Sequence, residues 1–224
     1  MPMRQTALLN LILLLLLFIL PAWAQAGFSS NSCHCFRNRS YDPEDRFAAD
    51  DYLVATTFNS LIAKSFHISK KKIVLLKMQG GVDPDDLLIA LYLARKSGRD
   101  PDLLLDVRNN GGSWRQIMHA SGLAGRQSDP VLRALARGDS GRQVAALITD
   151  SMIMDAFGID KNVIEQLRVT GFNGRQITVI CALAGHANRT PGAIAAMYRQ
   201  QKMSWAEIAA RFNLTPKEVG KIIA

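Results

Sequence analysis

The sequence predicts an all-α protein, and three observations support this fold class. Apolar residues in the segment 50–66 (DDYLVATTFNSLIAKSF) recur with a period near 3.6, which places them along one face of a helix. Residues that favour helix ends punctuate the chain from residue 69 onward. No segment of the sequence combines sustained polar–apolar alternation with β-branched enrichment, the pattern typical of a half-buried strand.

Four further helices are expected after the helix at 50–66, each with its own start and stop signals. Starts are indicated by residues whose side chains cap exposed backbone N–H groups, and ends by glycines, which adopt the left-handed conformation cheaply. Proline fits the first helical position, and Ser followed by Gln three residues later forms a capping box. The starts are Ser69, Asp83-Pro84, Asp100-Pro101 and Ser113 with Gln116, and the ends are Gly80, Gly98 and Gly122.

The second half of the chain repeats this punctuation 90 or 91 residues later. Phe66 corresponds to Phe157, and the pair Ser113-Trp114 corresponds to Ser204-Trp205. The repeated signals are Asp160, Gly171, Asn188, Thr190-Pro191, Ser204 with Glu207, and Asn213. Because two different sequences keep the same signals in the same order, the pattern predicts a tandem duplication of a roughly five-helix unit that ends in helix-turn-helix-like packing.

Composition shifts give the expected domain organisation. The parts are a signal peptide at 1–26, a Cys-containing lead-in at 27–49, a first helical unit at 50–123, a linker at 124–140 and a second helical unit at 141–224. Stretches rich in Gly, Ser, Asp and Arg at both ends of the linker mark it as a connection. Because the linker is short, the two units are expected to pack as one body.

The N-terminal segment has the features of a secretory signal peptide. Arg4 precedes the unbroken apolar run at 11–20, and small residues at Ala24 and Ala26 provide a cleavage site. This run is shorter than the ~20 residues that span a bilayer. The sequence therefore predicts an exported protein, periplasmic or secreted, that is not an integral membrane protein after cleavage. Retention of the leader as an anchor is the alternative.

Composition excludes several classes of protein. The 224 residues are 48% hydrophobic and 21% charged, which is unlike a disordered or collagen-like chain. Three Cys residues are too few for a disulfide-rich scaffold. The net charge of +8 predicts a moderately basic surface with weak attraction for acidic lipids or polymers.

The lead-in carries a candidate site for metal or redox chemistry, Cys33-His34-Cys35. Two thiolates and an imidazole are suitable ligands for zinc or copper. Alternatively, one of the two thiols pairs with Cys181 or with another chain in an oxidising compartment. Cys181 lies in an apolar helical segment, where a free thiol behaves as a small hydrophobic group. We expect Cys181 to be a buried core residue and favour disulfide or redox use of the other two thiols over metal binding.

Trp114 and Trp205 occupy matching positions directly after a helix-capping serine. Large aromatic side chains at such positions contribute a large buried area. We expect both to be structural anchors that hold the fifth helix of each unit against the fourth. A role in lining a ligand groove is the alternative.

The segment SWAEIAARFNLTPKEVGKII (204–223) resembles the helix-turn-helix of sigma-factor region four, through Trp205, Ile208, Leu214, Pro216 and Val219. This resemblance implies a second helix in the DNA major groove, with Lys217 and Lys221 facing the nucleic acid. The leader, which exports the chain away from the chromosome, argues against nucleic acid as a partner. The chain as a whole is similar to exported bacterial all-helical proteins with two tandem helical units, a resemblance that implies no activity.

No catalytic motif is present in the sequence. It lacks G-x-S-x-G, H-E-x-x-H and a phosphate-binding glycine loop. The leading hypothesis is therefore an exported, non-enzymatic binding or structural module of unknown ligand, whose partner is a protein or envelope component. Its cofactor is unknown, and the alternatives are none at all or zinc or copper at Cys33-His34-Cys35. The alternatives are a thiol-redox or metal protein that uses Cys33, His34 and Cys35, and a DNA-binding protein if the leader is misread.

Overall fold

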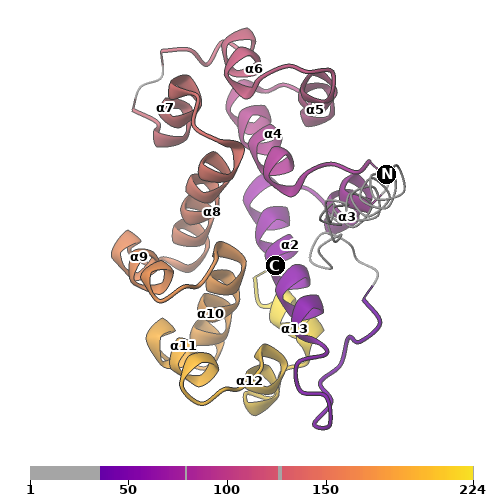
Figure 1. Ribbon diagram of the computed structural model, residues 1–224, viewed down its shortest axis with the longest axis vertical. Coiled ribbons are helices and arrows are strands. Elements are labelled where there is room, and N and C mark those ends of the chain that lie inside the picture. Colours follow the sequence, from indigo (N-terminus) through magenta and orange to yellow (C-terminus); the bar gives the residue numbers. More distant parts are fainter. Residues whose placement is uncertain (1–35, 79, 126–127, 224) are drawn as a thin grey trace, which may run out of the picture.

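The structure is a computed structural model that describes residues 36–78, 80–125 and 128–223, and these residues form twelve α-helices and no strand (Figure 1). The prediction of an all-α fold is confirmed. The helices are α2 (Asp50–Phe66), α3 (Lys70–Met78), α4 (Pro84–Ser97), α5 (Pro101–Asn109), α6 (Trp114–Ala120), α7 (Pro130–Arg137), α8 (Gly141–Phe157), α9 (Lys161–Val169), α10 (Gly174–His186), α11 (Pro191–Arg199), α12 (Trp205–Arg211) and α13 (Pro216–Lys221).

The two longest helices, α2 and α8, occupy the middle of the molecule (Figure 1). Helices α4 to α7 gather at one end of this pair, and α9 to α13 gather at the other. The spatial grouping therefore differs from the order along the chain, because α2 belongs to the first half of the sequence but extends into the group formed by the second half.

Helices from the other half of the chain pack along each long helix. Helix α4 packs along α8, and α10 packs along α2. The short helix α13 also packs on α2, whereas α7, which directly precedes α8 in the chain, packs on α8. The two halves consequently share one hydrophobic core that runs from Ala49 to Ile223.

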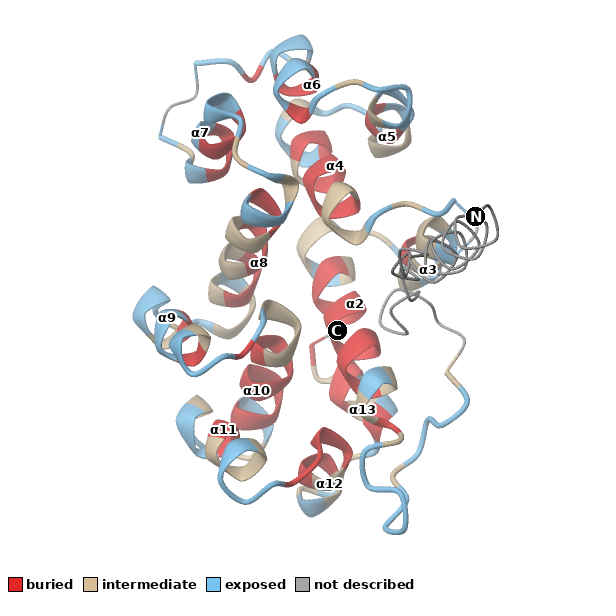
Figure 2. Ribbon diagram, in the orientation of Figure 1, coloured by how far each residue is buried: buried red, intermediate tan, exposed pale blue. Residues whose placement is uncertain are grey.

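Helix α2 is buried along most of its length, including its polar residues (Figure 2). Every residue from Leu53 to Ile62 is buried. The amphipathic stripe expected from the sequence is therefore only part of the buried surface. Lys70 of α3 donates hydrogen bonds to the hydroxyls of Thr56 and Ser60, and so satisfies polar groups that packing removes from water.

Most of the expected helix ends are confirmed. The two capping boxes expected at Ser113 and Ser204 form with both of their hydrogen bonds, and another forms at Thr215. Asn188 and Asn213 adopt positive φ angles of 51° and 58°, which Asn tolerates better than most residues. The prediction that the Asp160 side chain caps α9 is wrong: Asp160 occupies the N-cap position, but its carboxylate makes no capping hydrogen bond.

A helix, α7, occupies much of the segment expected to be a linker. Asp129 caps its first turn through the backbone N–H groups of Val131 and Leu132, and Gly138 ends it with a φ of 83°. Its apolar side chains are buried against α6 and α8. The segment 130–137 of the expected linker thus contributes to the core, because it forms one complete amphipathic helix.

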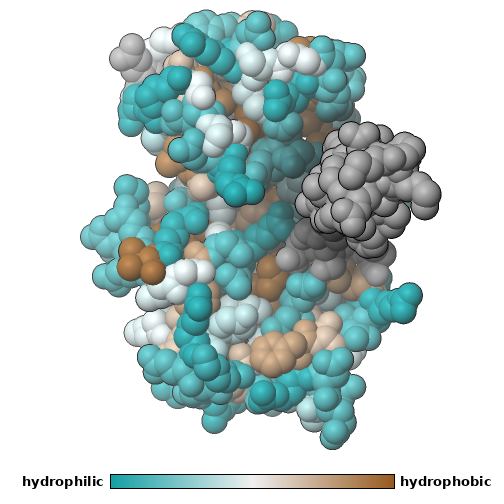
Figure 3. Space-filling model, in the orientation of Figure 1, coloured by the Kyte–Doolittle hydropathy of each residue, from teal (hydrophilic) through white to brown (hydrophobic). Residues whose placement is uncertain are grey.

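The surface seen in Figure 3 is mostly hydrophilic, with scattered hydrophobic positions. Large hydrophobic side chains that remain exposed are Phe47, Leu75, Met78, Leu103, Val107 and Val169. No helix in the described part of the chain is long and apolar enough to cross a membrane.

Candidate ligand-binding groove

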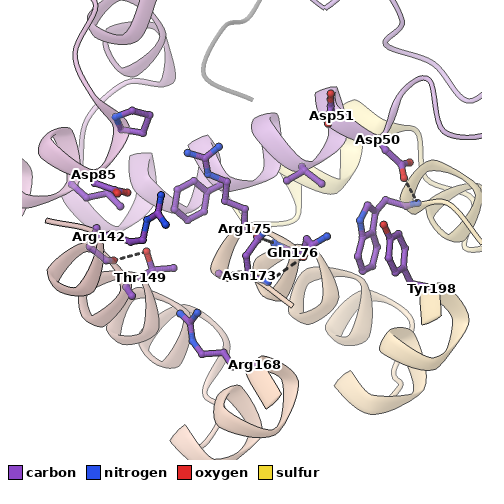
Figure 4. A pocket seen from close by; sticks show the side chains of 18 residues that line it. Asp50, Asp51, Asp85, Arg142, Thr149, Arg168, Asn173, Arg175, Gln176 and Tyr198 are labelled. Atoms are coloured by element: carbon purple, nitrogen blue, oxygen red, sulfur yellow. Dashed lines mark hydrogen bonds between the residues drawn. The ribbon is translucent and has the colours of Figure 1, made fainter. Parts of the chain in front are cut away.

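A groove of about 610 Å³ lies where helices from both halves of the chain meet (Figure 4). Its walls are formed chiefly by the first turns of α2, α4, α8, α10 and α12, together with Tyr198 near the end of α11. We call it the central groove. The lining residues are Asp50, Asp51, Val54, Phe58, Pro84, Asp85, Leu88, Arg142, Ala145, Ala146, Thr149, Arg168, Asn173, Gly174, Arg175, Gln176, Tyr198 and Trp205.

One end of the central groove is aromatic. The rings of Tyr198 and Trp205 are stacked, with 4.1 Å between centroids and 10° between planes. Phe172 packs against both rings, with centroid distances of 6.0 Å. This cluster fixes α12 against α11, because offset and tilted aromatic contacts contribute beyond the area they bury.

Asp50 connects the aromatic end of the groove to α2 through hydrogen bonds. Its two carboxylate oxygens accept hydrogen bonds from the backbone N–H groups of Trp205 (3.0 Å) and Ala206 (2.9 Å). The carboxylate thereby caps α12 from a helix more than 150 residues earlier in the chain. Burial raises the pKa of Asp50 to about 6, even though the two backbone hydrogen bonds act in the opposite direction.

Three guanidinium groups line the groove, and they differ in their partners. Arg168 forms an ion pair with Asp150. Arg175 lies over the ring of Phe58, 5.6 Å from its centroid, and burial lowers its pKa. Arg142 is exposed. Within the described residues, no carboxylate lies within ion-pair distance of Arg142 or Arg175.

Asp85 is the carboxylate that interacts most strongly with Arg175, although the two do not form an ion pair. It is half-buried at the start of α4, where burial, followed by the charge of Asp83, raises its pKa. Figure 4 places Asp85 and Arg142 at one end of the groove, Arg175 and Gln176 in the middle, and Asp50 and Tyr198 at the other end. The groove is therefore polar along its length, with charges of both signs.

Two uncharged donors in the groove have no partner within the described chain. They are the indole N–H of Trp205, whose residue is only 2% exposed, and the hydroxyl of Tyr198. The matching indole of Trp114 differs, because its Nε1 donates to the carboxylate of Asp86 at 2.6 Å. Trp205 lines the groove, whereas Trp114 does not.

The structure places the two tryptophans expected as anchors at the contacts between consecutive short helices. Trp114 of α6 contacts Asp86 of α4 and lies beneath the guanidinium of Arg108 of α5. Trp205 of α12 stacks on Tyr198 of α11. From the sequence, anchoring and groove lining were alternatives, but at Trp205 the two roles are compatible.

The other candidate residues lie outside the central groove or outside the described residues. Cys33, His34 and Cys35 belong to the part of the chain that the structure does not describe. Cys181 is buried, as expected, and burial raises the pKa of its thiol to about 12. In residues 36–78, 80–125 and 128–223, no group of three or more His, Cys, Asp or Glu side chains is arranged to hold a metal ion.

Lys217 and Lys221 lie on α13, which has six residues. Both lysines are exposed. The opposite face of the helix is packed tightly on α2: a Cβ atom at Gly220 would lie 3.1 Å from Ser60 Oγ. The structure thus brings these two lysines together on one short helix, away from the central groove.

Sequence reasoning missed most of the residues of the groove. In the sequence, Asp50 is an acidic residue at a helix start, which the helix dipole already favours, and Arg142 follows directly after the expected linker. No local motif joins Asp50, Asp85, Arg142, Arg175 and Tyr198, because they come from five different helices. Comparison of the chain with protein-family models, with curated proteins and with solved structures finds no match.

Proposed function

We propose that this protein is an exported, non-enzymatic binding module that holds an anionic ligand in the central groove. The observation that carries the proposal is Arg175, a half-buried guanidinium without a carboxylate partner in the described chain. Partial burial of a charge is costly unless a counter-charge and hydrogen bonds compensate. A carboxylate or phosphate group supplies both, because guanidinium binds these groups through two parallel hydrogen bonds.

A second guanidinium supports the same ligand chemistry. Arg142 lines the groove near Arg175 and likewise has no ion-pair partner in the described chain. Asp85 balances part of this positive charge, which favours a ligand that also donates hydrogen bonds.

We further propose that the chain arose by tandem duplication. The bounds of α2, α3 and α6 are related to those of α8, α9 and α12 by the same shift of 91 residues. One interaction is also repeated: Lys77 donates to Asn59 where Arg168 pairs with Asp150. The central groove forms where the two copies meet, which explains why neither copy contains a complete set of its residues.

The anion-binding proposal is tested by calorimetric titration of the purified protein with citrate and with inorganic phosphate at low ionic strength. Arg175→Gln removes the half-buried charge and is expected to weaken binding about tenfold or more, because hydrogen bonds to charged groups contribute about 1.5–3 kcal/mol. Arg189→Gln is the matched control, since Arg189 is exposed and lies outside the groove. Absence of binding of both anions to the wild-type protein overturns the proposal.

The proposal of export is tested separately. Expression of the full chain in a bacterium, followed by mass spectrometry of the periplasmic fraction, is expected to give a protein that begins at Gly27. An uncleaved chain in the cytoplasmic fraction contradicts export. That result would favour the alternative of DNA binding through Lys217 and Lys221.

A further inference from the structure

We infer that the ligand of the central groove is an acidic sugar, with its carboxylate at the arginines and its hydroxyl groups at the aromatic end. This inference rests on the proposed function and specifies its ligand. It follows from the way in which unpaired hydrogen-bonding groups are distributed along the groove. Arg142 lies at one end and Arg175 in the middle, whereas Tyr198, on which Trp205 stacks, lies at the other end (Figure 4).

Trp205 offers a hydrogen-bond donor to the groove. Its residue is 2% exposed, but its indole N–H is not among the fully buried polar atoms of the described chain that lack a partner, so this N–H is accessible from the groove. The matching indole of Trp114 donates to Asp86, whereas that of Trp205 has no acceptor in the described chain. Since Trp205 lines the groove, a bound ligand is the natural source of that acceptor.

The acidic groups at the aromatic end limit the charge that this acceptor can carry. The aromatic end of the groove contains Asp50 and Asp51 and no guanidinium or ammonium group among its lining residues. The negative charge of Asp50 also acts on the hydroxyl of Tyr198, whose pKa is raised by burial and by this charge. A second anionic group here would be repelled, so the ligand presents an uncharged oxygen. A hydroxyl fits best, because it accepts from Trp205 or Tyr198 and also donates to a carboxylate.

The part of the groove away from the aromatic end suits an anionic group. Arg142 and Arg175 attract an anionic group, and Asp85 beside them offers an acceptor for a neighbouring hydroxyl. One ligand that reaches both ends therefore carries an acid at one side and several hydroxyls at the other. A volume of about 610 Å³ lies within the range of small-molecule sites. These requirements describe a sugar acid, whereas inorganic phosphate satisfies only the arginines.

The test compares glucuronate, glucose and inorganic phosphate by calorimetry on the full-length protein and three variants. Tyr198→Phe removes one hydroxyl and is expected to weaken glucuronate binding roughly two- to tenfold, the range for a neutral hydrogen bond, while phosphate binding stays unchanged. Arg142→Gln is expected to weaken binding of both anions. Tyr41→Phe is the matched control outside the groove and is expected to change neither.

The outcomes separate this inference from the proposed function. Tighter binding of glucuronate than of glucose or phosphate, with the selective effect of Tyr198→Phe, supports the sugar acid. If phosphate and glucuronate bind equally and Tyr198→Phe weakens neither, the sugar inference is wrong and the anion site stands. If the wild-type protein binds none of the anions, including citrate, the proposed function fails as well. A circular dichroism spectrum of each variant excludes loss of folding as the cause.

Discussion

Asp50 joins two distant parts of the chain through a single carboxylate. Its oxygens accept two backbone hydrogen bonds from α12, while burial disfavours its ionised form. The balance between these effects makes the residue sensitive to pH near neutrality. At the residue scale, the aromatic end of the central groove therefore depends on one titratable group.

This arrangement predicts a specific pH dependence of stability. Burial raises the pKa of Asp50 from its ordinary 3.8 to about 6, so folding favours the protonated form. The contribution of Asp50 to the free energy of unfolding therefore increases as the pH falls through about 6 toward 4, and is lowest above pH 6. Asp50→Asn removes this titration.

Urea unfolding of both proteins between pH 4 and 7.5 measures the effect. As the pH falls, the wild-type protein is expected to gain stability relative to Asp50→Asn. Parallel stability curves for the two proteins would show that the carboxyl has an ordinary pKa in the fold.

At the scale of helices, close approach is possible only where side chains are small. Gly174 at the start of α10 lies against α8, and a Cβ atom there would lie 2.6 Å from Thr149 Cγ2. Thr149 is buried and its hydroxyl is bonded to the backbone of α8, so it has little freedom to move. Glycine therefore allows α10 to reach the position in which Arg175 and Gln176 face the groove.

Gly174→Ala is expected to lower the free energy of unfolding by about 1–3 kcal/mol through overpacking. Gly192 in the first turn of α11 is the matched control, because nothing lies within 4 Å of a Cβ atom there. Gly192→Ala is expected to be neutral or to stabilise by up to about 1 kcal/mol, since alanine favours the helix. Chemical denaturation measures both effects. Equal effects of the two changes would contradict the steric explanation.

The helices differ in how completely local sequence defines them. Capping boxes at Ser113, Ser204 and Thr215 were predictable, because each requires only a residue and its neighbour three positions later. Helix α7 was missed, since its eight residues lie in a segment with the composition of a loop. The burial of polar residues in α2 was also missed, because it depends on α10 and α13, which lie far along the chain.

At the scale of the whole molecule, exchange of helices between the two halves makes them interdependent. The apolar surface of α2 is covered by α10 and α13 from the second half, and α4 from the first half covers part of α8. A single half would expose much of this surface to water. Burial of apolar surface is the main favourable term in folding, so a single half is expected to be unstable.

This interdependence predicts the behaviour of a divided chain. Polypeptides that cover residues 36–125 and 128–224 are each expected to lack a cooperative thermal transition when studied alone. Mixed in equal amounts, they are expected to associate and to regain helical circular dichroism together with one cooperative transition. Independent cooperative unfolding of either fragment would contradict the shared core.

The sequence by itself determined the all-α class, most helix ends and the burial of Cys181, because caps and periodicity act over a few neighbouring residues. It did not determine which helices pack together. Only the tertiary structure decided that α4 lies on α8 and α10 on α2, since these contacts are set by the fit of whole helix faces. The central groove belongs to this second level: Asp50, Arg175 and Trp205 come to line one groove through packing, and no spacing along the chain indicates this.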